Sequence, residues 1–150
     1  MTGWRPRALI VEDDPDLLVV LRVNLQAAGF DISLAADGRT ALARIEAEHP
    51  DVVLLDVMLP GMDGWSVLAQ LRERDDRAAV IVCSAKRNAA DLERAEELGA
   101  VAYLVKPFDI DRVVEAATQA VAVRDPATSA RESSPVREAR PWPSLDFGLG

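Results

Sequence analysis

The amino-acid sequence predicts an α/β fold, namely a doubly wound parallel sheet of five strands with five helices. Short apolar segments typical of strands alternate with longer amphipathic segments of helical periodicity along the chain. The apolar segments are continuous, which is typical of strands that are covered on both faces. Alternation of this kind implies parallel strands joined by helices that pack on both faces of the sheet.

Each expected strand is a run of four or five mainly apolar residues. The runs are Ala8–Val11, Asp31–Ala35, Val52–Leu55, Val80–Cys83 and Val101–Val105. A helix is expected after each run, because apolar residues recur there at spacings of three and four.

Polar residues that favour helix N-caps precede four of the expected helices. They are Asp14, Asp37, Asn88 and Asp109, and a proline follows Asp14 at a position where proline begins a helix well. Asp37 and the glycine after it could also form a hairpin turn. The helical spacing of the apolar residues that follow favours the cap.

The alternating pattern extends to about Arg124, so we expect one domain over residues 1–124. Residues 125–150 are rich in proline, serine, alanine and arginine and lack sustained periodicity, which is typical of a disordered tail. Trp142 and Phe147 near its end leave open a second interpretation, a short docking peptide.

Composition excludes several classes of protein. The formal net charge is −8, so we expect no direct DNA binding, because the phosphate backbone would repel the domain. The single cysteine, Cys83, excludes an internal disulfide and a thiolate metal site, and its apolar neighbours indicate a core position. The chain lacks a run of about 18 apolar residues and a signal peptide, so we expect a cytoplasmic protein that spans no membrane.

Polar residues directly follow four of the expected strands. They are Glu12 and Asp13 after the first strand, Asp56 after the third, Ser84 after the fourth and Lys106 after the fifth. The carboxyl ends of parallel strands lie at one edge of a sheet, where open α/β sheets place their chemistry. We therefore expect an acidic pair, a single carboxylate, a hydroxyl and an ammonium group to converge there.

This set of groups favours phosphoryl chemistry. Three neighbouring carboxylates repel one another unless a cation lies between them, and Mg²⁺ suits oxygen ligands of this kind. The Asp56 carboxylate can act as a nucleophile toward phosphorus, while Lys106 and Ser84 supply donors for the phosphoryl oxygens. Taken singly, Asp56 could be a helix cap, and Lys106 and Ser84 ordinary surface and strand-end residues. Their expected convergence favours a functional site.

The motifs that carry these residues resemble those of the receiver domains of two-component response regulators. The matching segments are Leu9–Pro15, Pro50–Gly64, Val82–Ala85 and Tyr103–Phe108, and the resemblance covers about residues 7–124. It implies the strand order 2-1-3-4-5 of the flavodoxin-like fold. It also implies a signalling module rather than a turnover enzyme, with chemistry confined to gain and loss of one phosphoryl group.

The resemblance further implies a role for each site residue. Asp56 resembles the phosphoacceptor, which receives its phosphoryl group from a histidine kinase or a histidine phosphotransfer protein. Mg²⁺ would be held by Asp13 directly, by Glu12 through water, by Asp56, and by the backbone carbonyl of Met58. Lys106 resembles the lysine that pairs with the phosphoryl group, and its bond to the following proline is expected to be cis.

Ser84 and Tyr103 hold the switch positions of the family. Phosphorylation is expected to draw Ser84 toward the phosphoryl group, after which Tyr103 turns inward and reshapes the face formed by the last two helices and the fifth strand. That face is expected to contact a downstream protein, with the chain a monomer or a weak dimer through it. Tyr103 could instead be a strand aromatic with an exposed hydroxyl. Met58 and Lys86 offer no acid or amide to orient water, so we expect a long-lived phosphoryl state.

Three further interpretations stay open. The chain could be the receiver part of a longer regulator with a separate output domain, or a receiver that binds partners without being phosphorylated. A metal-dependent phosphatase with an aspartyl nucleophile is the third. That class usually carries an aspartate two residues after its nucleophile, where this chain has Met58.

Overall fold

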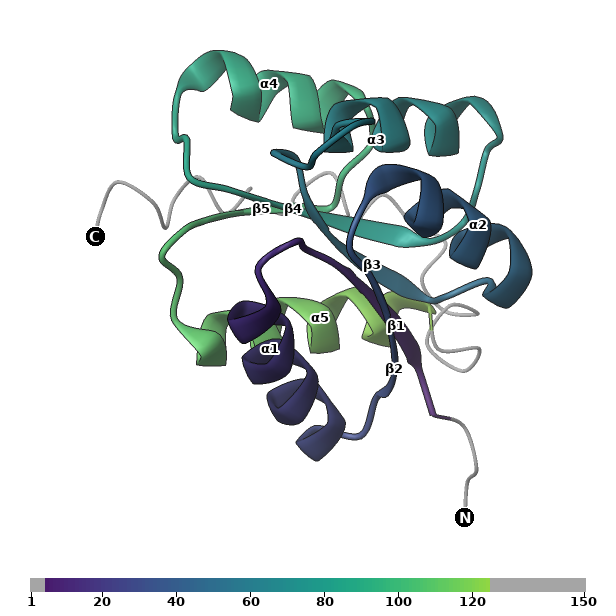
Figure 1. Ribbon diagram of the computed structural model, residues 1–150, viewed down its shortest axis with the longest axis vertical. Coiled ribbons are helices and arrows are strands. Elements are labelled where there is room, and N and C mark those ends of the chain that lie inside the picture. Colours follow the sequence, from purple (N-terminus) through teal and green to yellow (C-terminus); the bar gives the residue numbers. More distant parts are fainter. Residues whose placement is uncertain (1–4, 125–150) are drawn as a thin grey trace.

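The computed structural model describes residues 5–124, which form a five-stranded parallel sheet with five helices (Figure 1). The strands are β1 (Arg7–Val11), β2 (Asp31–Ala35), β3 (Val52–Asp56), β4 (Ala79–Ser84) and β5 (Ala102–Val105). The helices are α1 (Pro15–Ala27), α2 (Gly38–Glu48), α3 (Gly64–Glu73), α4 (Ala89–Glu97) and α5 (Ile110–Arg124). The sheet order is β2-β1-β3-β4-β5, so the predicted fold class and strand order are confirmed.

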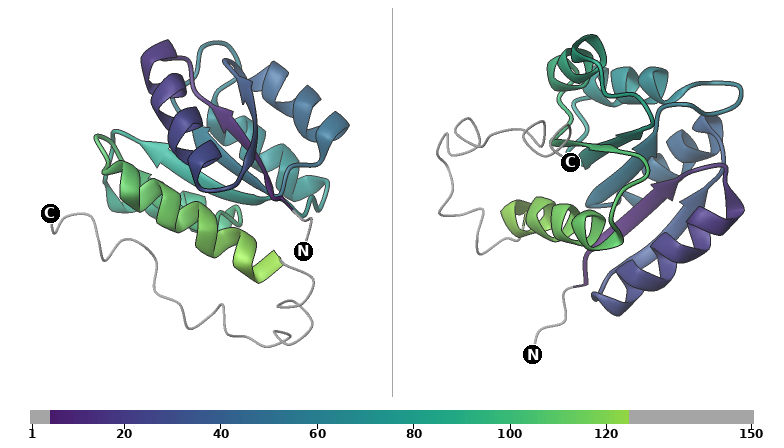
Figure 2. Two further views of the ribbon diagram at one scale, coloured as in Figure 1. Left: turned by 90° about the horizontal axis from the view of Figure 1, so that it is seen from below. Right: turned by 90° about the vertical axis from the view of Figure 1, so that its left-hand side faces the viewer.

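The helices form two layers, one on each face of the sheet. α1 and α5 cover one face, whereas α2, α3 and α4 cover the other (Figure 1 and Figure 2). Strand side chains alternate between the faces, so every strand contributes to both layers. In β1, Leu9 and Val11 belong to the core with α2, α3 and α4, whereas Ala8 and Ile10 belong to the core with α1 and α5. Apolar residues on both faces explain why the strands read as continuous apolar runs.

β3 is the central strand, and all five of its residues are buried. It pairs with β1 on one side and with β4 on the other. Its last residue, Asp56, is 4% exposed. A strand that is held along both edges and covered on both faces fixes the backbone that carries this carboxylate.

The predicted helix caps are in place. The cap side chains accept backbone hydrogen bonds from the first turn, from Asp16 to Asp14 (2.9 Å), Thr40 to Asp37 (2.8 Å), Asp91 to Asn88 (2.8 Å) and Asp111 to Asp109 (3.0 Å). Asp37 is therefore a cap and not a hairpin residue. α3 has a cap that the sequence analysis did not assign, Asp63, which accepts from the backbone N–H of Ser66 at 2.9 Å.

Several predicted boundaries differ from the structure by one residue. β3 includes Asp56 and β4 includes Ser84, because the ladders continue through the register pairs Asp56 with Cys83 and Ser84 with Val105. α4 ends at Glu97, with Leu98 as its C-cap. Asp56 and Ser84 are thus the last residues of their strands and are held by the sheet itself.

The predictions of a disordered tail and of no membrane-spanning segment remain to be compared with the structure. The tail predicted over residues 125–150, with the docking peptide around Trp142 and Phe147, lies outside the described residues. Within residues 5–124, no helix is long and apolar enough to cross a membrane.

The Cys83 thiol is buried, as predicted, and we expect it to be unreactive in the folded protein. Burial raises the pKa of Cys83 to about 12, so the reactive thiolate is scarce at neutral pH. A small thiol reagent such as Ellman's reagent should leave the native protein unlabelled and should label one thiol after denaturation. Labelling of the native chain at the rate of the denatured chain would contradict the burial of this side chain.

Candidate functional site

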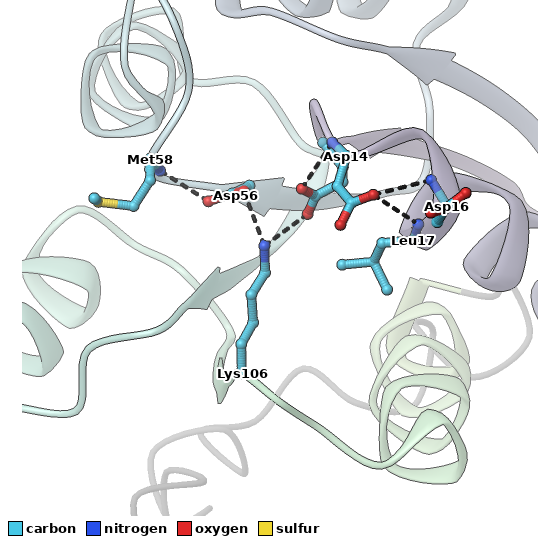
Figure 3. A network of polar contacts seen from close by, with 7 residues as sticks. Asp14, Asp16, Leu17, Asp56, Met58 and Lys106 are labelled. Carbon is cyan, nitrogen blue, oxygen red and sulfur yellow. Dashed lines mark hydrogen bonds and ion pairs between the residues drawn. The ribbon is translucent and has the colours of Figure 1, made fainter.

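The candidate site lies at the carboxyl edge of the sheet, where β1, β3 and β5 end. Figure 3 shows Lys106, which follows β5, extending toward Asp56 at the end of β3. The Nζ atom of Lys106 lies 3.0 Å from Asp56 Oδ2 and 2.8 Å from Glu12 Oε1. One ammonium group thus bridges two buried carboxylates, Glu12 directly after β1 and Asp56 at the end of β3.

Both oxygens of Asp56 accept hydrogen bonds. Oδ2 accepts from Lys106 Nζ, and Oδ1 accepts from the backbone N–H of Met58 at 2.8 Å. Charge-assisted bonds of this kind fix the orientation of a carboxylate and compensate for its removal from water. Asp56 is therefore a pre-oriented carboxylate at the edge of a rigid strand.

Glu12 is 3% exposed and also uses both of its oxygens. Oε1 accepts from Lys106 Nζ, and Oε2 accepts from the backbone N–H of Asp14 at 3.2 Å. Burial raises the pKa of Glu12, and the charge of Asp56 adds to this effect, whereas the bonds to Lys106 and Asp14 oppose it. The Lys106 ammonium therefore stabilises the charged form of the buried Glu12 carboxylate.

Lys106 supplies the positive charge at the site. Its backbone N–H donates to the carbonyl of Ser84 at 2.8 Å, which ties the residue to the end of β4. Its bond to Pro107 is cis, as predicted. Burial alone would lower the pKa of Lys106, but the hydrogen bonds to Glu12 and Asp56 outweigh burial and raise it. The ammonium form is thus stabilised by the two carboxylates that it bridges.

Three acidic residues could hold a metal ion. Glu12, Asp13 and Asp56 offer oxygen atoms that lie within 4.8 Å of one another, with Asp13 exposed and the other two buried. Hard oxygen donors from a few carboxylates, open to water on one side, fit Mg²⁺. Met58 contacts Asp56 through its backbone N–H, and the ligand role of its carbonyl stays a prediction.

Ser84 and Tyr103 meet at the backbone of Lys86. The Ser84 Oγ accepts from the Lys86 N–H at 3.0 Å, and the Tyr103 hydroxyl donates to the Lys86 carbonyl at 2.7 Å. Ser84 and Tyr103 are each 1% exposed. These two bonds hold the segment between β4 and α4 next to the candidate site.

Tyr103 lies in an inward position in this structure. Its side chain is buried while the Ser84 Oγ accepts from the Lys86 N–H, and the expected movement of Tyr103 on phosphorylation stays a prediction. Its ring packs in the same core as Ala95, and the Lys86 carbonyl satisfies its hydroxyl, so the inward position leaves no unpaired polar group. The alternative of an exposed hydroxyl is wrong, because Tyr103 is 1% exposed and its hydroxyl donates to the Lys86 carbonyl. Burial raises the pKa of Tyr103.

Sequence reasoning missed the backbone N–H groups that orient the carboxylates of the site. The N–H of Asp14, which orients Glu12, and the N–H of Met58, which orients Asp56, leave no signal in residue type, because every residue but proline has this donor. Gly64 did have a signal, as it ends the Pro/Gly loop after Asp56. Its N–H donates to the Val57 carbonyl at 3.2 Å and closes that loop.

Comparison with known proteins identifies the family. Residues 8–118 match the family model described as the response regulator receiver domain, a span that holds Glu12, Asp56, Ser84, Tyr103 and Lys106. The chain belongs to this family. It is a receiver domain of the two-component response regulators, as the sequence motifs indicated.

Curated relatives of this receiver domain include proteins named as regulators of transcription. The transcriptional activator protein IrlR of Burkholderia pseudomallei is 45% identical over 108 residues, which are 72% of this chain and 47% of IrlR. The transcriptional regulatory protein PrrA of Mycobacterium leprae is 39% identical over 131 residues, which are 87% of this chain and 56% of PrrA. The chain thus spans about half the length of the curated relatives that it matches.

Solved structures confirm the fold of the receiver domain. The receiver domain of Francisella response regulator 1452 superposes with a TM-score of 0.78 at 29% identity, covering 81% of this chain and 100% of that one. The signal receiver domain of a LuxO repressor protein from Vibrio parahaemolyticus gives 0.79 at 28% identity, covering 87% and 100%.

Replacement of Lys106 by methionine should strengthen Mg²⁺ binding, although it removes a site residue. The Lys106 ammonium occupies Glu12 and Asp56, the same carboxylates that offer oxygens to a metal, so the two cations compete. We expect Lys106→Met to lower the Mg²⁺ dissociation constant by about tenfold, or ~1.4 kcal/mol. Titration calorimetry measures this, and Lys86→Met is a control that removes a nearby positive charge without touching either carboxylate contact. Weaker Mg²⁺ binding in Lys106→Met alone would contradict the competition.

Proposed function

We propose that this receiver domain is a phosphoacceptor module, in which Asp56 takes a phosphoryl group from a histidine kinase or a histidine phosphotransfer protein. The observation that carries the proposal is the bridge from Lys106 to Asp56 and Glu12. It supplies an oriented carboxylate nucleophile and a cation beside it at one point of the sheet edge. Membership of the receiver family supports the choice of phosphoryl donor.

The transfer needs a nucleophile, a leaving group and compensation for negative charge. A carboxylate oxygen of Asp56 forms a bond to phosphorus while the bond from phosphorus to the donor's imidazole nitrogen breaks, and the imidazole takes up a proton. The Lys106 ammonium, already 3.0 Å from Asp56 Oδ2, offsets the charge of the incoming phosphoryl oxygens. The Met58 N–H holds the other oxygen of Asp56 and so limits rotation of the carboxylate.

Glu12, Asp13 and Asp56 would hold Mg²⁺, together with the Met58 carbonyl. Bound there, the ion supplies positive charge to the acidic cluster and to phosphoryl oxygens. The charges of the site residues support this assignment. Three carboxylates lie close together, and the positive charge of Lys106 balances only part of their negative charge. Phosphoryl oxygens would make the site more negative still, and a second cation offsets that excess.

Phosphorylation of Asp56 would change the partners that are available to Ser84. Its Oγ now accepts from the Lys86 N–H, and a phosphoryl oxygen offers a charged acceptor for its own proton. If Ser84 turns to the phosphoryl group, the Lys86 N–H loses its partner, and the segment before α4 is free to rearrange. Because Tyr103 already binds the Lys86 carbonyl, phosphorylation would stabilise its inward position rather than create it.

The face formed by α4, β5 and α5 would then carry the signal to a downstream protein, in a monomer or in a weak dimer through that face. A second output is favoured by relatives such as MtrA of Mycolicibacterium smegmatis, named a DNA-binding response regulator and 41% identical over 108 residues. In that case the receiver domain controls a DNA-binding domain. The net charge of −8 makes direct DNA contact by this chain unfavourable in either case.

The direct test is incubation with Mg²⁺ and acetyl phosphate, followed by measurement of the intact mass. We expect one phosphoryl adduct on the unaltered chain and none on Asp56→Asn, which keeps the size of the side chain but removes the nucleophile. Asp51→Asn is a matched control, because Asp51 accepts from the Arg7 N–H away from the site. An unaltered chain without an adduct contradicts phosphorylation, and repeated turnover of a phosphate ester would favour a phosphatase.

The phosphoryl group on Asp56 should be long-lived and should become shorter-lived when Met58 is replaced by asparagine. The Met58 side chain is 57% exposed beside the site and cannot orient water, whereas an amide can accept a hydrogen bond from an attacking water. We expect Met58→Asn to raise the hydrolysis rate by about tenfold, or ~1.4 kcal/mol of transition-state stabilisation. Met58→Leu is the control, and decay of the adduct after removal of acetyl phosphate gives the rates. Equal lifetimes in Met58→Asn and Met58→Leu would refute the role of this side chain.

A further inference from the structure

The loop that connects Asp56 to α3, residues 57–63, is closed at its far end by Gly64. We call these residues the acceptor loop. The Gly64 N–H donates to the Val57 carbonyl at 3.2 Å. A Cβ atom at Gly64 would lie 2.5 Å from the Asp56 carbonyl oxygen and 2.5 Å from the Val57 Cα, closer than side-chain carbons approach backbone. The start of α3 therefore rests directly on the end of β3.

The acceptor loop has a second close contact, with α2. Gly38 is the first residue of α2 and is buried. A Cβ atom at Gly38 would lie 2.6 Å from the Met62 carbonyl oxygen and 3.0 Å from the Met62 Cβ. On its other side, Met62 places its sulfur 4.0 Å from the Gln70 side-chain nitrogen on α3. Met62 is thus partly buried and lies close to both helices.

Space, and not backbone conformation, explains the glycine at position 38. Among the described residues, the glycines with positive φ are Gly29, Gly61 and Gly99, so the backbone of Gly38 could accept a side chain. In helix interiors alanine is favoured over glycine by about 1 kcal/mol, so helix propensity gives no reason for glycine here. The Asp37 cap, which accepts from the Thr40 N–H at 2.8 Å, holds the first turn of α2 in position. Any larger residue would have to displace the Met62 backbone or this turn.

We propose that Gly38 and Met62 are positioning residues for Asp56, with the start of α2 setting the position of the acceptor loop. Val57 and Leu59, the residues on either side of Met58 in the sequence, are buried, at 3% and 7% exposure. The position of the Met58 backbone is therefore set by how the acceptor loop packs. Its N–H orients Asp56, and its carbonyl is a predicted ligand of Mg²⁺. The part of the inference that concerns Mg²⁺ rests on the proposed function, whereas the effect on the Met58 N–H does not.

The effect on the site follows from the direction of the contact. A methyl group at position 38 pushes on the Met62 carbonyl, a backbone atom that cannot turn away as a side chain would. A shift of the acceptor loop moves the Met58 N–H relative to Asp56 Oδ1, now 2.8 Å apart. Outer residues that orient metal ligands commonly change metal affinity by ~10 to 100-fold when altered.

The test compares Gly38→Ala with Thr40→Ala in the full chain. Thr40→Ala alters the same helical turn and its cap without adding atoms toward Met62. Titration calorimetry with Mg²⁺ alone, without a phosphodonor, gives the dissociation constant, and NMR gives the Met58 amide shift in the metal-free protein. We expect Gly38→Ala to weaken Mg²⁺ binding by about tenfold and to shift the Met58 amide, and Thr40→Ala to do neither even where both lower the melting temperature.

Met62→Ala provides a second route if Gly38→Ala does not fold. It removes the side chain that fills the space between α2 and α3 and leaves α2 unaltered, so it should weaken Mg²⁺ binding and shift the Met58 amide in the same way. Unchanged Mg²⁺ affinity and an unchanged Met58 amide in Gly38→Ala or in Met62→Ala would overturn the inference. If the unaltered chain itself binds no Mg²⁺, the proposed function fails, and the Met58 amide shift still decides whether α2 positions the loop.

Discussion

The candidate site depends on a single ammonium group, that of Lys106, held between the carboxylates of Glu12 and Asp56. The three residues follow or end three different strands, so their contact exists only when β1, β3 and β5 lie in the same sheet with their carboxyl ends together. Hydrogen bonds of 2.8 Å and 3.0 Å leave little tolerance for a shifted register. The parallel sheet, with cores on both faces, supplies that accuracy, because a shift of any one strand would disturb both cores.

Ser84 connects this charge cluster to the surface that would carry a signal. Its carbonyl accepts from the Lys106 N–H, and its hydroxyl accepts from the Lys86 N–H. One residue at the end of β4 therefore contacts both the lysine of the site and the segment that leads into α4. In the proposed function, a change in negative charge at Asp56 would reach α4 through this residue. The buried Tyr103, bound to the other side of the Lys86 peptide, limits the arrangements which that segment can adopt.

The sequence was sufficient to predict the fold and the convergence of Glu12, Asp56 and Lys106 at one edge of the sheet. Strands buried on both faces read as continuous apolar runs, and parallel topology brings their ends to one edge, so Asp56, Ser84 and Lys106 could be placed together before any contact was known. The details that it could not supply depend on non-local space or on backbone donors. The inward position of Tyr103 depends on a carbonyl 17 residues away in the chain. The need for glycine at position 38, at the start of α2, depends on Met62, which lies in the loop between β3 and α3.

We expect Lys106 and Ser84 to change partners when Asp56 carries a phosphoryl group, whose oxygens are strong charged acceptors. A crystal structure of the chain with Mg²⁺ and beryllofluoride, a stable mimic of the phosphoryl group on a carboxylate, tests it most directly. We expect the Lys106 Nζ and the Ser84 Oγ each to lie within hydrogen-bonding distance of a fluorine, and the Ser84 Oγ to have left the Lys86 N–H. A beryllofluoride adduct on Asp56 in which Lys106 still bridges Glu12 and Asp56, and Ser84 still binds Lys86, would contradict it.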